Sequence, residues 1–218
     1  MTEQWIFILA MTCVAPAAAG VAIYKKIDRI FKPAVYILVL SVIAELLIKW
    51  SLLYNKPLVS GNLITNIFLL LNTSLYIYLF YSLQVLRGKF TALFIFLVFL
   101  IAFLFNAYYA GSVNKFYFYA SLICSIIILF MAVEGITIQT FRSKEKWSSD
   151  FIFLFCIITV IYNANAVFFF SITLIGMAEG ELYRKILDIY KFINAACNLL
   201  YVWPILCIPR NRSYIKLF

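Results

Sequence analysis

The sequence contains no histidine and little charge of either sign. Among its 218 residues, Asp, Glu, Lys and Arg together make up only 12%. A soluble domain carries roughly twice that charged fraction, so a soluble globular fold is excluded. Without histidine, the chain lacks the commonest general base, metal ligand and pH switch. These absences favour binding over catalysis.

Other chemical signatures are missing as well. The five cysteines show no paired spacing, and no Cys, Asp or Glu residues cluster with the spacing of metal ligands. Glu45, Glu134 and Asp188 belong to different depths of the predicted membrane layer, so paired carboxylates are not expected. A retinal protein would need a lysine near the middle of its last membrane span to bind retinal. Lys191 lies near the end of its predicted span, so this class of protein is not expected. We therefore predict that the protein is not an enzyme and has no catalytic residue, metal or cofactor.

Long apolar runs dominate the rest of the sequence, in which 66% of the residues are hydrophobic. A helix needs about 20 apolar residues to cross the hydrocarbon layer of a bilayer. Seven such runs are separated by polar or charged segments, which predicts one all-α, polytopic transmembrane domain over residues 1–218. The seven predicted spans are residues 5–24, 33–53, 63–85, 90–109, 116–138, 151–175 and 186–208.

The basic residues between the spans alternate in density. Twelve of the eighteen basic residues follow the first, third, fifth and seventh spans, and they are Lys25, Lys26, Arg29, Lys32, Arg87, Lys89, Arg142, Lys144, Lys146, Arg210, Arg212 and Lys216. Because basic segments stay on the cytoplasmic side, the N-terminus is predicted outside and the C-terminus inside. The net charge of +9 then reflects orientation in a lipid bilayer rather than nucleic-acid binding. We expect a multi-pass protein of the cell membrane, and of the inner membrane in a bacterium.

Polar side chains inside the spans are the candidate ligand-binding residues. Such groups cost a few kcal/mol at membrane depth unless they face partners or water. At about 1.5 Å per residue, two layers are expected. The outer layer, about 3 to 8 Å deep, contains Lys49, Asn66, Asp188 and Lys191, and the inner layer, about 12 to 18 Å deep, contains Glu45, Asn72, Asn163, Asn194 and Asn198.

Their spacing indicates how these residues share helix faces. Glu45 and Lys49 are four residues apart, in the order that favours an ion pair on a helix. In the last span, polar residues follow one another at steps of three and four, which predicts one polar stripe; they are Asp188, Lys191, Asn194, Asn198 and Tyr201. A stripe of this length should face other spans or a water-filled cavity.

Two functional interpretations follow. In the first, the polar residues line a pocket open to the outside that binds a small polar or zwitterionic solute, in a transporter or a sensor. In the second, they form hydrogen bonds between helices in a non-catalytic accessory or regulatory subunit. Such a subunit would act through lipid contacts or through contacts with a second copy or another membrane protein. We favour the first interpretation, and the convergence of the polar residues on a cavity would distinguish the two.

A weak internal repeat supports the first interpretation. Residues 66–72 align without gaps on residues 188–194, and residues 41–45 align on residues 159–163, which predicts a 3+1+3 arrangement of parallel repeats. In this arrangement the chain resembles the SWEET and PQ-loop transporters. The resemblance implies that Asn72 and Asn194, with Asn66 and Asp188 above them, face one another across a central solute site. The chain also resembles small seven-span membrane proteins of bacteria in its Glu45 and its Asn66-Ile67-Phe68 segment, a resemblance that implies no activity.

Overall fold

The fold was analysed in a computed structural model of the chain. The structure describes residues 3–53, 61–86, 88–110, 115–142, 150–175 and 180–209, and these residues form helices with no strand among them. Six helical segments are long and apolar enough to cross a membrane. The predicted all-α, polytopic membrane fold is therefore confirmed.

The first predicted span is a broken helix. It consists of α1 (Glu3–Ala10), a single 3-10 turn η1 (Met11–Cys13) and α2 (Val14–Ile23). Pro16 lies in the first turn of α2 and has no N–H to donate to the carbonyl of Thr12, which explains the tighter turn before it. The apolar helical stretch Phe7–Ile23 is shorter than the six long segments.

The other spans are long helices whose ends differ from the prediction by up to five residues. A short 3-10 turn η2 (Arg29–Phe31) leads into α3, and a turn at Tyr201 separates α8 from α9. Pro204 again lies at the start of the second piece and lacks the N–H that would continue α8. These helices are α3 (Lys32–Leu53), α4 (Gly61–Ser82), α5 (Lys89–Ala110), α6 (Phe118–Arg142), α7 (Phe151–Leu174), α8 (Glu181–Leu200) and α9 (Val202–Leu206).

Three predicted boundaries need correction. The third span ends at Ser82 rather than at residue 85, because Gln84 adopts a left-handed φ of 57° that ends the helix. The fifth span continues past residue 138 to Arg142. The last span begins at Glu181 instead of residue 186, since its charged first turn is helical and contains a Lys185–Glu181 salt bridge of 2.7 Å.

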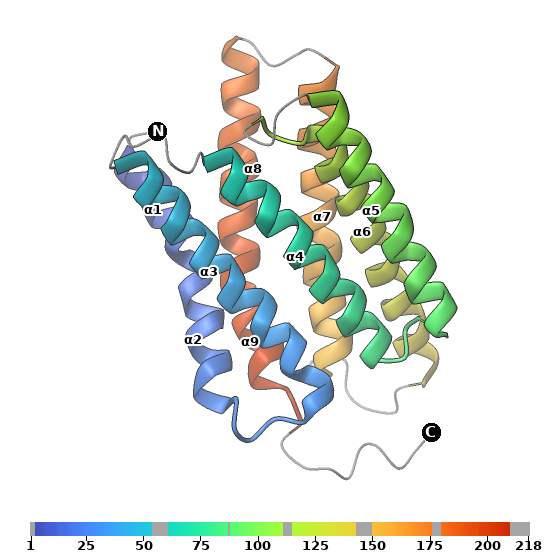
Figure 1. The fold of residues 1–218 in the computed structure, drawn as a ribbon. Helices are drawn as coiled ribbons and strands as arrows, with labels where there is room; N and C mark the ends of the chain where they lie inside the picture. The colour runs from blue at the N-terminus through green and yellow to red at the C-terminus, as the bar shows by residue number, and fades with distance from the viewer. Residues whose placement is uncertain are drawn as a thin grey trace.

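The helices form a ring that follows chain order (Figure 1). Each helix from α2 to α4 packs against the next, α4 contacts α6, and α7 connects α6 to α8. The ring closes where α8 and α9 pack against α1, η1 and α2. Helix α5 lies beside α4 and α6, and only 11% of its most apolar stretch is buried against the other helices. The predicted orientation of the chain in the membrane and the predicted 3+1+3 repeat stay predictions.

The two halves of the bundle differ in packing. We call the end where α1, α4, α6 and α8 begin the α1 end, which is at the top of Figure 1. The buried apolar cluster occupies mainly the opposite half, where Phe31, Phe80, Phe155 and Ile205 are almost completely buried. In the half nearer the α1 end, the helices enclose a cavity instead of a packed core.

Candidate functional site

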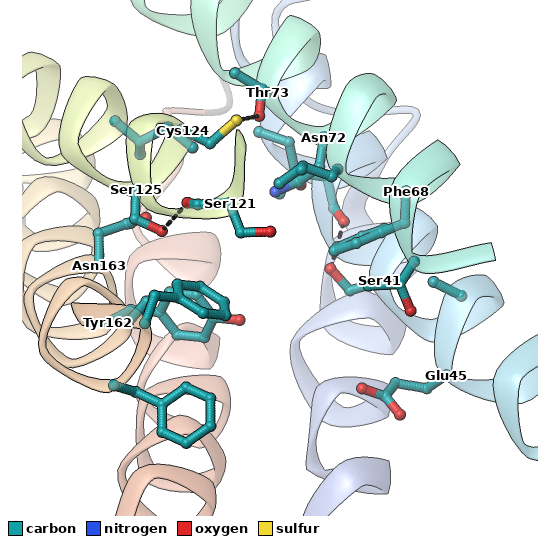
Figure 2. Close-up of a pocket in the computed structure, with 18 of the residues that line it drawn as sticks. Ser41, Glu45, Phe68, Asn72, Thr73, Ser121, Cys124, Ser125, Tyr162 and Asn163 are labelled. Carbon is teal, nitrogen blue, oxygen red and sulfur yellow. Dashed lines mark hydrogen bonds between the residues drawn. The ribbon is translucent and has the colours of Figure 1, made fainter. Parts of the chain in front are cut away.

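The candidate site is a cavity of about 530 Å³ inside the ring. Residues of α3, α4, α6, α7 and α8 line it, and it extends from the first turns of α4 and α8 to Ile128, ten residues into α6. At 1.5 Å per residue, this depth is about 15 Å along α6. Figure 2 shows the residues of α3 and α4 on one side of the space and those of α6 and α7 on the other. The polar and ionisable lining residues are Cys13, Ser41, Glu45, Asn62, Thr65, Asn72, Thr73, Tyr76, Ser121, Cys124, Ser125, Tyr162, Asn163, Tyr183, Tyr190, Asn198 and Tyr201.

Tyrosines line the deepest part of the cavity, where hydrogen bonds and ring contacts hold them in place. The Thr159 hydroxyl donates to the carbonyl of Phe155 at 2.7 Å and lies 2.9 Å from the Tyr201 hydroxyl. Since Thr159 has one hydroxyl hydrogen, Tyr201 is the donor in the second bond. Tyr76 packs against the ring of Phe155 with centroids 6.2 Å apart. These bonds and ring contacts fix the floor of the cavity to the packed half of the bundle.

Four hydroxyls in the walls can act only as hydrogen-bond acceptors toward a solute. The hydroxyls of Ser41, Thr65, Ser121 and Ser125 each donate to a carbonyl one turn earlier in the chain, at 2.9 Å. Each hydroxyl thereby uses its only hydrogen and keeps lone pairs for an acceptor role. The side-chain oxygen of Asn72 is buried and has no hydrogen-bond partner in the described part of the chain.

Among the described residues that line the cavity, Glu45 is the only charged one, and none is a lysine or an arginine. Its carboxylate points from α3 into the space that Tyr162 faces from α7 (Figure 2). Within the described ranges, Glu45 forms no salt bridge, and the ion pair with Lys49 favoured by their spacing is absent. Instead, the Lys49 ammonium lies 5.3 Å from the centroid of the Phe7 ring on α1. The cavity therefore contains a half-buried carboxylate without a cationic partner.

The structure brings together four of the nine predicted binding residues. Glu45, Asn72, Asn163 and Asn198 line the cavity. Asn163 also donates to the carbonyl of Thr159 at 2.9 Å, and Asn198 donates to the hydroxyl of Thr12 at 3.3 Å. These bonds anchor the two amides on the neighbouring helices α7 and α8.

The other five predicted residues lie outside the lining, and they are Lys49, Asn66, Asp188, Lys191 and Asn194. Asn66 is buried, donates to the carbonyl of Lys115 at 2.8 Å and accepts from the backbone N–H of Tyr117 at 3.2 Å. The side-chain oxygen of Asn194 accepts a bond of 3.3 Å from Asn165 on α7. These two asparagines thus connect one element to another.

The predicted stripe of α8 does not lie on one face. A helix turns about 100° per residue, so each step of three residues moves the stripe back by about 60°. Asp188 and Asn194 are therefore about 120° apart around the helix. Two residues of the stripe, Asn198 and Tyr201, line the cavity together with Tyr183 and Tyr190.

Four tyrosines in the lining were not indicated by the sequence, namely Tyr76, Tyr162, Tyr183 and Tyr190. Tyrosine in a membrane protein is expected at the interface with water, so these residues were not predicted to line a cavity. A signal was nevertheless present, because Tyr76 and Tyr162 lie near the middle of their predicted spans rather than at the ends. Tyr190 stacks on Phe169 with ring centroids 4.3 Å apart.

Comparison of the chain with protein families, curated proteins and solved structures finds no match. Among the described residues, no group of three Cys, Asp or Glu side chains is placed to bind a metal ion. The fold and the cavity together define a polytopic α-helical membrane protein with a polar chamber inside its helix ring.

Proposed function

We propose that the protein binds a small polar solute in the cavity, as a transporter or a sensor in the membrane. The observation that carries the proposal is the Glu45 carboxylate, without a salt bridge among the described residues, in a chamber of about 530 Å³ whose largely apolar walls contain several polar groups. Pockets for small ligands have volumes of about 300 to 1,000 Å³. A carboxylate and an amide oxygen without partners are costly at membrane depth, and a solute with hydrogen-bond donors would offset that cost.

The packing of the two halves supports a direction of access. The cavity approaches the α1 end, and the apolar cluster around Phe80, Phe155 and Ile205 fills the space between it and the opposite end. In the predicted orientation the α1 end faces outside, so a solute would enter from outside the cell. Transport would require the packed half to separate, whereas sensing would require only a change in the contacts of α3, α7 or α8.

A second candidate is the accessory or regulatory membrane subunit, which acts through protein or lipid contacts. The observation that favours it is the use of Asn66, Asn165 and Asn194 in hydrogen bonds between separate elements. Such bonds hold helices together without any ligand. Solute binding is the property that separates the two candidates.

The test is thermal unfolding of the purified full-length protein in detergent with a panel of sugars, amino acids, nucleosides and amines. A ligand that binds only the folded state at about 100 times its Kd stabilises it by about 2.7 kcal/mol. We expect at least one member of the panel to raise the Tm. If none does, the solute-binding proposal is wrong and the accessory function is favoured.

A matched pair of variants locates the binding site. Ser41 lines the cavity and bonds only to its own helix, so Ser41→Phe places a ring in the chamber without breaking a contact between helices. Thr137 makes the same kind of bond to Val133 on the exposed side of α6 and serves as the control, Thr137→Phe. Ser41→Phe should abolish the ligand-dependent shift, and Thr137→Phe should retain it. Equal shifts in both variants would place the ligand elsewhere.

A further inference from the structure

We infer that the solute is a small organic cation, a protonated amine or a quaternary ammonium ion, an inference that rests on the proposed function. Three independent features of the cavity lead to this class. They are the sign of its charge, the hydroxyls that can only accept hydrogen bonds and the aromatic surfaces around it.

The charge of the lining has one sign. Glu45 supplies a carboxylate, and no Lys or Arg among the described lining residues balances it. Lys49, one turn further along α3, lies against the Phe7 ring, and Lys191 is outside the lining. An anion would meet only repulsion here, and the carboxylate of a zwitterion would lack a partner. The zwitterionic solute expected from the sequence is therefore disfavoured, because that expectation included both lysines in the site.

The neutral polar groups favour the same class. The hydroxyls of Ser41, Thr65, Ser121 and Ser125 have donated their hydrogens to carbonyls of their own segments. Their oxygens keep lone pairs that can accept hydrogen bonds from a solute. A protonated amine has only donors, so its hydrogen-bonding capacity complements these walls.

Aromatic rings supply the remaining surface. Phe169 and Tyr190 form a stacked pair, and Phe170 lies against both Phe116 and Phe118 with centroids 6.0 and 6.5 Å apart. All five residues line the cavity. Aromatic faces attract organic cations, and combinations of rings recognise ammonium groups in many proteins. Calcium ions prefer several carboxylate and carbonyl oxygen ligands at short distances, and Glu45 is the only carboxylate among the described lining residues.

The experiment compares two solutes of the same shape that differ in charge. Choline carries a quaternary ammonium group, and 3,3-dimethyl-1-butanol is its neutral carbon analogue. Thermal shift and calorimetric titration use the purified full-length protein in detergent, with sodium chloride at equal ionic strength as the salt control. We expect choline or a small primary amine, such as phenethylamine, to bind at least about tenfold more tightly than its neutral analogue.

Glu45→Gln tests the origin of that preference, because it keeps the shape of the side chain and removes its charge. The matched control is Glu134→Gln, an exposed acid on α6 outside the lining. Glu45→Gln should reduce the affinity for the cation about tenfold or more and leave that of the neutral analogue unchanged. Glu134→Gln should change neither affinity.

Failure of this inference is distinguishable from failure of the proposed function. Equal binding of choline and its neutral analogue, or an unchanged affinity for the cation in Glu45→Gln, would overturn the cation class while solute binding stands. The cation class would also be overturned if a sugar, nucleoside or anion raised the Tm while neither choline nor the primary amine did. A rise in Tm produced by sodium chloride alone would mean that the cavity binds an inorganic cation, and the organic-cation inference would be wrong. If no solute of any class binds, both proposals are overturned.

Discussion

At the scale of single residues, the buried asparagines differ in what the fold supplies to them. Asn66 satisfies two backbone groups that precede α6, the carbonyl of Lys115 and the N–H of Tyr117. The oxygen of Asn72, six residues further along the same helix, is buried without a partner in the described part of the chain. The residue type is the same, but one amide stabilises the fold and the other carries a desolvation cost.

This difference predicts opposite results for the same substitution. Asn66→Leu leaves two backbone groups without their partner and should lower the free energy of unfolding by about 1 to 3 kcal/mol. Asn72→Leu removes an unsatisfied oxygen and should leave stability unchanged or raise it. Denaturant unfolding in mixed micelles measures both. Equal losses in the two variants would contradict the assignment.

At the scale of elements, breaks and close contacts between helices determine where the cavity walls lie. Pro16 and Pro204 interrupt the first and last spans, and α2 and α9 pack against each other. Helices α6 and α7 make the most extensive contact in the bundle. Gly135 permits their close approach, because a Cβ there would lie 2.7 Å from the sulfur of Cys156.

Gly135→Ala should therefore destabilise the protein. The added methyl overpacks a fully buried site and should cost about 1 to 3 kcal/mol, measured as a lower Tm in detergent. Adding Cys156→Ala removes the clashing sulfur and should restore part of the loss. Gly88→Ala is the control, since the nearest atom to its new Cβ is 3.9 Å away. If Cys156→Ala gives no rescue, the clash is not the cause.

At the scale of the whole molecule, the bundle combines a packed half with a hollow half. The apolar cluster joins α3, α4, α6, α7 and α9 away from the α1 end, and the cavity separates several of the same helices nearer to it. The direction in which the cavity faces in a cell depends on the orientation of the bundle. That orientation was predicted from the basic residues alone.

Labelling of single cysteines tests the orientation. Lys115 and Lys26 are exposed at opposite ends of the bundle, and four of the five native cysteines are buried, with Cys207 half-buried. In intact cells, a membrane-impermeant maleimide should modify Lys115→Cys, whereas Lys26→Cys should react only after permeabilisation. The unsubstituted protein gives the background. The reverse pattern would place the α1 end in the cytoplasm.

Much of the fold followed from the sequence because its physical causes are local. The length of an apolar run sets whether a helix crosses a bilayer, and each of the six long helices coincides with a predicted span to within a few residues. Four residues that the sequence singled out, Glu45, Asn72, Asn163 and Asn198, lie in the lining. Their depth along the helices follows from counting residues.

The tertiary structure alone decided which polar groups share the cavity and which are used between helices. That choice depends on the rotation of each helix about its axis, which packing sets and which residue spacing constrains only weakly. The rotation of α8 directs Tyr190 and Tyr201 to the chamber and leaves Asp188 and Lys191 out of the lining. Lys49 contacts an aromatic ring on another segment rather than its neighbour Glu45. The sequence by itself therefore determined an apolar, histidine-free helical membrane protein, and the arrangement of its helices decided that Glu45 is the one carboxylate of the described residues that faces the cavity.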